Sequence, residues 1–279
     1  MQWVDAGFGE LVEQLWVILF LSIRCGAALI AAPVIGGMVI PGQIRALLAI
    51  ALGVFLTQWV ALPAPPEMLS FAAILAIVQE VVIGAAMGFV LQIAFAVPLI
   101  AAEQIAGTMG LAIATSIDPT SGAQAGALGT FFGLILTLLF YAIGGHLLWF
   151  ELLLESYRVM PAGGFIFAQA SAYELVMFGG YAFATAAAIG LPVVLVLLCV
   201  QVVTGTISRS APALNLFALG LPAGVLAGMA ALIIVMPIVV EQFALLLQTT
   251  FDQAAGLLAP DAPNAPNASN SSSAVIASR

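Results

Sequence analysis

Lysine is absent from this sequence of 279 residues, and arginine is scarce. Five basic residues stand against thirteen Asp and Glu, which gives a formal net charge of -8. A nucleic-acid-binding surface needs a basic stripe to neutralise phosphates, and a polybasic lipid-binding patch needs clustered Lys and Arg. The composition therefore excludes both classes.

Cysteine and histidine are also rare. Cys25 and Cys199 lie in apolar stretches, with no second cysteine or histidine at ligand spacing, so neither a metal site nor a disulfide framework is indicated. The single histidine, His146, has no serine or carboxylate spacing around it that suggests a triad. Zinc-protease, Walker and dinucleotide-binding motifs are missing as well. We expect no cofactor and no enzymatic activity.

A positively charged segment before the first apolar stretch, typical of a cleavable signal peptide, is missing. The first arginine, Arg24, lies inside that stretch. We therefore expect the apolar segments to be mature structure, inserted as they stand.

Apolar residues are abundant: 63% of the chain is hydrophobic and 6% is charged, against roughly 45–50% and 25% in soluble domains. The apolar runs have about the length of a membrane-spanning helix or more, and they lack the alternation of barrel strands. The sequence predicts an all-α integral membrane protein with about six long apolar helices. The segments are 15–32, 46–62, 69–102, 126–150, 175–203 and 214–247.

Residues 254–279 differ in kind, because Ala, Pro, Asn and Ser dominate them. Such a composition offers too little apolar surface to offset the entropy of ordering. We predict a disordered tail.

Glycines recur every fourth residue at Gly84 and Gly88, and again at Gly220, Gly224 and Gly228. This spacing places a flat strip on one helix face, which lets helix backbones approach closely in lipid. We expect these positions to be packing contacts. Prolines inside the apolar stretches predict interrupted helices, whose freed carbonyls need partners in protein or water.

Ionisable residues within membrane segments are costly and therefore candidates for function. Arg24 and Glu80 are the clearest, and they are candidates to pair with each other. Such a pair has two interpretations: an ion pair that only fixes helix packing, or a functional group.

Residues 107–126 form a poor helix, with Asp118-Pro119 at their centre and glycines at both ends. A loop at membrane depth must be shielded by protein or line a cavity. The alternative is a short external loop between two helices.

The motifs together resemble the FliR/SctT family of type III secretion export-apparatus membrane proteins over about residues 10–250. The matching residues are Arg24, Pro33, Gly36, Pro41, Arg45, Glu80, Gly84, Gly88, Glu103, Gly107, Gly110, Leu111, Asp118, Pro119, Gly144, Gly145, His146, Glu155, Ser156 and 207–222. Ala213 stands where the family pattern has glutamine. The lack of lysine favours the flagellar branch.

The resemblance implies a subunit that forms and closes the pore of a flagellar protein export gate in the bacterial inner membrane. Residues 1–165 would be FliP-like and residues 166–253 a FliQ-like hairpin. The implied partners are FliP-like and FliQ-like subunits, FlhB and FlhA, and unfolded flagellar substrates. The implied pore plug comprises Gly110, Leu111, Ile113, Ile117, Asp118, Pro119 and Gly122. The implied buried polar or assembly residues are Arg24, Glu80, Glu103, His146, Arg209 and Asn215.

A multi-pass secondary transporter is the alternative. Its broken helices, with Arg24, Glu80 and Glu103, would bind a small solute. Transporters usually show an internal repeat with matching interruptions in both halves, and no convincing repeat is present here.

Overall fold

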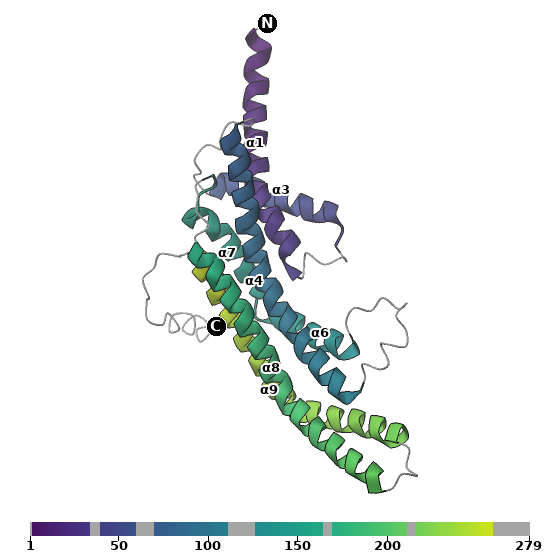
Figure 1. Cartoon of the computed structure of the whole chain (residues 1–279). Coiled ribbons are helices and arrows are strands. Elements are labelled where there is room, and N and C mark those ends of the chain that lie inside the picture. Colours follow the sequence, from purple (N-terminus) through teal and green to yellow (C-terminus); the bar gives the residue numbers. More distant parts are fainter. Residues whose placement is uncertain are drawn as a thin grey trace.

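The computed structural model describes residues 2–33, 40–59, 70–110, 126–163, 169–210 and 216–258. Every regular element in these ranges is a helix, which confirms the predicted all-α class (Figure 1). The helices are α1 (Gln2–Ala31), α3 (Gly42–Trp59), α4 (Phe71–Met109), α6 (Ala127–Ala142), α7 (Gly145–Val159), α8 (Gln169–Ser210) and α9 (Leu216–Leu258).

The prediction of about six apolar helices is confirmed. Within the described residues, five helices are long and apolar enough to cross a membrane, and a bent pair brings the number to six. The bent pair is α6 and α7, which meet at 68°. The prediction of one continuous segment over 126–150 was therefore wrong. Gly144 adopts a left-handed conformation with φ of 72° between the two helices, which ends α6 and lets the chain turn.

Several helices extend beyond their predicted bounds. α4 begins after Ser70, whose hydroxyl accepts from the Ala73 N–H, and continues as one helix to Met109. α9 continues to Leu258, past the predicted tail boundary at residue 254. Ala254, Leu257 and Leu258 are buried, so their packing offsets the entropy of ordering these last turns.

The prolines do not interrupt the helices as we expected. Pro98 lies inside α4, Pro192 inside α8, and Pro222 and Pro237 inside α9. Each proline removes one backbone hydrogen bond, but packing against neighbouring helices keeps a long apolar helix continuous. Pro119 and Pro212 lie outside the described residues.

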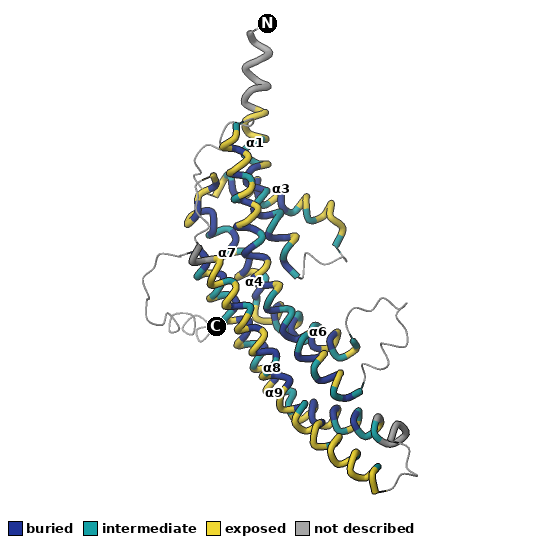
Figure 2. Tube along the Cα trace, in the orientation of Figure 1, coloured by how far each residue is buried: buried dark blue, intermediate teal, exposed yellow. Residues whose placement is uncertain are grey.

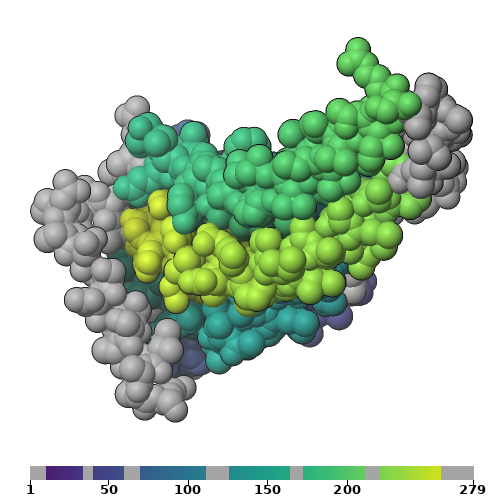
Figure 3. All heavy atoms as spheres, turned by 90° about the horizontal axis from the view of Figure 1, so that it is seen from below, coloured from purple at the N-terminus to yellow at the C-terminus, as the bar shows by residue number. Residues whose placement is uncertain are grey.

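α4 is the central helix, and it packs against α1, α6, α8 and α9. α1 also packs against α3, while α8 and α9 form a long antiparallel hairpin along the lower half of α4 (Figure 1). Buried residues concentrate on α4 and on the face of α1 toward it, whereas the outer faces of the hairpin are exposed (Figure 2). Seen from below, α8 and α9 lie side by side and cover much of the molecule (Figure 3).

Two glycines of α4 set its distance from α1. A Cβ on Gly84 would overlap the carbonyl oxygen of Arg24, and one on Gly88 would lie 2.6 Å from the carbonyl oxygen of Ala28. Only glycine allows the two backbones to approach so closely. The carbonyl of Arg24 is therefore in direct contact with α4, close to where its side chain crosses between the helices.

Candidate functional site

Arg24 of α1 and Glu80 of α4 form a buried, bidentate ion pair. The Arg24 Nε donates to Glu80 Oε2 at 2.8 Å, and Nη2 donates to Oε1 at 3.0 Å. Arg24 is 0% exposed and Glu80 is 1% exposed. A single charge buried this way would be prohibitively costly, and paired hydrogen bonds of this geometry are the arrangement that makes it tolerable.

The same pair holds the C-terminal end of α7. Arg24 Nη1 donates to the Ser156 carbonyl at 2.8 Å, and Nη2 donates to the Met160 carbonyl at 2.9 Å. The Gly163 N–H donates to Glu80 Oε1 at 3.3 Å. The Ser156 carbonyl also accepts from the Met160 N–H at 2.9 Å, so the guanidinium gives it a second donor at the end of the helix. One ion pair thus fastens α1, α4 and α7, and we call this site the α1–α4–α7 junction.

Tyr157 completes the junction. Its hydroxyl donates to the Leu21 carbonyl on α1 and lies 3.4 Å from the Cys25 Sγ. Its ring lies under the guanidinium, with Arg24 Cζ 4.1 Å from the ring centroid, a distance at which a cation–π attraction is expected. The tyrosine therefore binds α7 to α1 from a second direction.

The other predicted polar residues do not join this cluster. His146 lies in the first turn of α7, against the Tyr141 ring at 5.0 Å between centroids. Its Nδ1 is buried and makes no hydrogen bond with the described residues. Arg209 is exposed in the last turn of α8. Asn215 lies outside the described residues.

A second group of contacts lies at the C-terminal part of α4 and the start of α6. Gly110 ends α4 with φ of 81°, and its N–H donates to the Gly107 carbonyl at 3.2 Å. The Glu103 carboxylate of α4 accepts from the N–H of Gly126 at 3.3 Å. Gly126 precedes α6, so one side chain of α4 contacts the start of α6. The remaining predicted plug residues lie outside the described residues: Leu111, Ile113, Ile117, Asp118, Pro119 and Gly122.

The α8–α9 hairpin holds the end of α4. The Gln201 amide of α8 donates to the Thr108 carbonyl at 2.7 Å. The Met109 side chain fills the space over Gly228 of α9, where an added Cβ would lie 2.7 Å from the Met109 Cε. Gly224 of the same strip faces the Met109 carbonyl oxygen, with 3.4 Å to an added Cβ. The third glycine, Gly220, is half-buried.

Sequence reasoning missed Tyr157, Met109 and Gln201. Gln201 did carry a usable signal, since an amide inside the apolar run of α8 needs a partner. Tyr157 and Met109 are ordinary apolar or aromatic core residues by type, and nothing in the sequence distinguishes them. No group of three or more potential metal ligands occurs among the residues that the structure describes.

Comparison with known proteins decides the family. A model of the family described as bacterial export proteins, family 1, matches residues 15–250. The chain belongs to this family. The FliR/SctT resemblance drawn from the motifs is thereby confirmed.

Curated FliR relatives match over most of their length, and a SpaR relative matches over about half. Flagellar biosynthetic protein FliR of Escherichia coli (strain K12) is 29% identical over 227 residues, which is 80% of this chain and 86% of that protein. FliR of Bacillus subtilis (strain 168) is 27% identical over 261 residues, which is 90% and 97%. The surface presentation of antigens protein SpaR of Shigella sonnei is 28% identical over 145 residues, which is 51% and 55%.

The family and the apolar helices together establish the location. This chain is a multi-pass protein of the bacterial inner membrane, and its family consists of export proteins. The family model covers the junction residues and most of the α8–α9 hairpin.

Proposed function

We propose that this chain forms and closes the pore of the flagellar type III protein export gate, which passes unfolded flagellar proteins across the inner membrane. Family membership and the similarity to FliR proteins support the pathway. The role needs neither a catalytic group nor a cofactor, because the subunit acts as a wall and a barrier.

The observation that carries the pore-closing role is the Glu103–Gly126 hydrogen bond. Glu103 lies seven residues before Gly110, about 10 Å along the helix axis. The bond therefore joins the start of α6 to α4 about two turns before α4 ends. A plug over residues 110–122 needs both of its ends anchored in this way.

The proposed division of the chain separates the α8–α9 hairpin from the helices before it. Residues 1–165 correspond to the FliP-like part and residues 166–253 to the FliQ-like hairpin. The outer faces of α8 and α9 carry many exposed large apolar side chains, which suits contact with neighbouring subunits as well as lipid. The proposed partners are FliP-like and FliQ-like subunits, with FlhB and FlhA next to them.

The transporter alternative finds little support in the junction. A transporter needs charged groups that face a solute in a water-filled cavity. Arg24 and Glu80 are instead directed at each other and at the end of α7, and both are fully buried.

Purification of the full chain in a mild detergent from its native membrane tests the proposal. We expect a complex that contains FliP-like and FliQ-like chains. A solitary monomer or homodimer that binds a small solute would contradict it. In parallel, a deletion strain should lose its flagellar filaments, and the wild-type gene should restore them; normal filaments would remove the chain from this pathway.

A further inference from the structure

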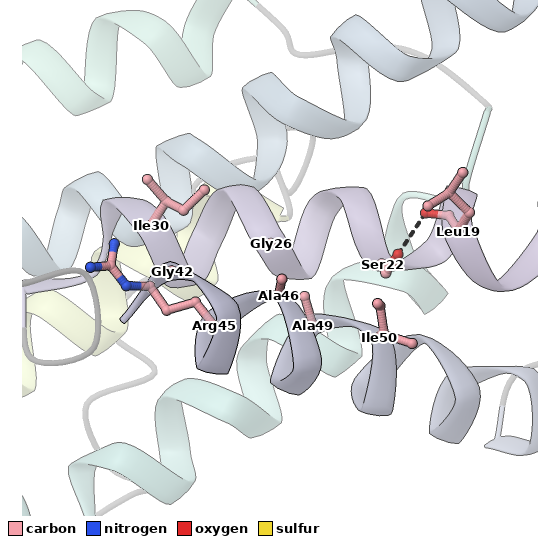
Figure 4. A pocket seen from close by; sticks show the side chains of 9 residues that line it. All are labelled: Leu19, Ser22, Gly26, Ile30, Gly42, Arg45, Ala46, Ala49 and Ile50. Atoms are coloured by element: carbon pink, nitrogen blue, oxygen red, sulfur yellow. Dashed lines mark hydrogen bonds between the residues drawn. The ribbon is translucent and has the colours of Figure 1, made fainter. Parts of the chain in front are cut away.

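A groove runs between α1 and α3 on the outside of the molecule (Figure 4). It has a volume of about 410 Å³. The floor is formed where the helices touch, because a Cβ on Gly26 would lie 3.6 Å from the Ala49 Cβ. The rims are apolar and exposed: Leu19 is 50% exposed, Ile30 64% and Ile50 44%.

Among the residues that the structure describes, the groove has no polar wall along its length. The Ser22 hydroxyl, which lines it, donates to the Leu19 carbonyl at 2.7 Å and is satisfied there. Residues 14–31 of α1 and 42–59 of α3 contain no Asp or Glu. An occupant therefore meets hydrocarbon along the groove and no negative charge from either helix.

One end of the groove is positively charged. Arg45 lies there beside Ile30, in the first turn of α3, while Leu19 and Ile50 lie at the opposite end (Figure 4). Two of its N–H groups point at the Ile40 carbonyl, at 3.2 Å from Nε and 2.7 Å from Nη2. These bonds fix the guanidinium at the mouth. The N-terminus of α3 adds partial positive charge at the same end.

The length of the groove matches one half of a bilayer. Leu19 and Ile30 are eleven residues apart on α1, which corresponds to about 16 Å along the helix axis. The hydrocarbon core of a membrane is about 30 Å thick, so one leaflet contributes about 15 Å.

We propose that this groove binds one acyl chain of an anionic phospholipid, with the headgroup phosphate at Arg45. The tail lies along Gly26 and Ala46, and the phosphate lies beside the first turn of α3. Both helices belong to candidate membrane spans, and α3 is the least buried of these spans, so lipid has direct access. The site does not depend on the proposed pore-closing role.

The test measures lipid retention by the full-length chain in detergent, by native mass spectrometry with added phosphatidylglycerol or phosphatidylcholine. We expect one phospholipid to be retained more tightly than the rest. Phosphatidylglycerol should be favoured over phosphatidylcholine about fivefold, the effect of one basic residue on an anionic lipid. Equal retention of the two lipids would overturn the headgroup assignment.

Two exposed alanines of α3 give a matched pair of variants. Ala46 lines the groove, whereas Ala51 is exposed on the same helix outside it. Ala46→Trp fills the groove and should remove the retained lipid, while Ala51→Trp should keep it. If Ala46→Trp folds poorly, Ala46→Leu against Ala51→Leu serves the same purpose. Equal retention by the two variants would contradict the proposal.

Substitution of Arg45 separates charge from shape. Arg45→Gln should lower phosphatidylglycerol retention about fivefold, and Arg45→Lys should preserve most of it. No loss with Arg45→Gln would overturn the headgroup assignment.

The Ala46→Trp variant also tests for a protein occupant. If it retains lipid normally but no longer co-purifies with other subunits, a neighbouring protein occupies the groove, and the lipid proposal is overturned.

Discussion

The α1–α4–α7 junction holds α4 around Glu80, and the α8–α9 hairpin holds its C-terminal end, and the two do so by different physical means. At the junction, a fully buried ion pair contacts α7 carbonyls, and glycine brings two backbones into contact. At the hairpin, a flexible methionine side chain fills the space over a glycine, and one amide reaches the helix end. Both contacts are close. Only at the junction are the contacting groups tied to one another, so that none can move without the others.

The difference indicates where the molecule tolerates adjustment. Buried charges are stable only with all their partners, so the junction is all-or-none. Methionine has three rotatable bonds and adapts to changed surroundings. We therefore expect the junction to hold α4 in a fixed position. The contact between the C-terminal end of α4 and the hairpin should instead adapt to structural changes near Gly110.

The largest effect is expected from Glu80→Gln, which leaves the Arg24 charge buried without its counter-charge. We expect a loss of about 3–5 kcal/mol in the free energy of unfolding in detergent. Glu155→Gln is the matched control, because Glu155 and Arg158 form an exposed pair at 2.9 Å whose worth is below about 1 kcal/mol. Adding Arg24→Met to Glu80→Gln should recover part of the loss. Equal effects of the two glutamate substitutions would refute the all-or-none view of the junction.

Alanine substitutions along α4 test its backbone contact with α1. Gly84→Ala should cost about 1–3 kcal/mol, because the new Cβ meets the Arg24 carbonyl and must push the helices apart. Gly107→Ala on the same helix meets open space and should stabilise the chain by up to about 1 kcal/mol through helix propensity. Thermal denaturation in detergent measures both. The distinction fails if Gly84→Ala is as stable as Gly107→Ala.

The hairpin's polar contact should matter less. Gln201→Leu removes the hydrogen bond to the Thr108 carbonyl and should cost about 0.5–1.5 kcal/mol. The exposed Gln14 of α1 provides the control, Gln14→Leu, for which we expect little change. Denaturant titration of both variants gives the difference; a cost for Gln201→Leu as large as that of Glu80→Gln would remove the contrast between the two regions.

The smallest effect is expected at the methionine contact. Gly228→Ala presses on Met109 Cγ, Sδ and Cε, and rotation of this side chain relieves the pressure. The cost should stay below about 1 kcal/mol, clearly smaller than that of Gly84→Ala. Gly205→Ala on α8 is the control in open space. A Gly228→Ala cost equal to that of Gly84→Ala would mean that the hairpin contact is as rigid as the junction.

Much of the fold was predictable because lipid-exposed helices leave a strong compositional signal. The apolar runs and their glycine spacing indicated the helices. Arg24 and Glu80 stood out as ionisable groups in apolar surroundings. Helix bounds were less predictable: α4 passes through Pro98 and α9 through Pro237, because tertiary packing overrides the local effect of proline.

The contribution of α7 to the junction could not be read from the sequence. Arg24 binds the carbonyls of Ser156 and Met160, and a backbone carbonyl is the same for every residue type. The position of α7 also depends on the turn at Gly144, whose left-handed conformation becomes visible only in the structure. The hydrogen bond between Glu103 and Gly126 was only partly predictable for the same reason. Glu103 stood out in the sequence, but its partner is a backbone N–H.

The most direct test of the pore-closing role is the ion conductance of membranes that contain the assembled gate with residues 111–121 of this chain deleted. We expect a clear rise in conductance over the wild type, whereas removal of residues 259–279 should leave it at the wild-type level. A deleted chain that assembles normally and conducts no more than the wild type would contradict the account.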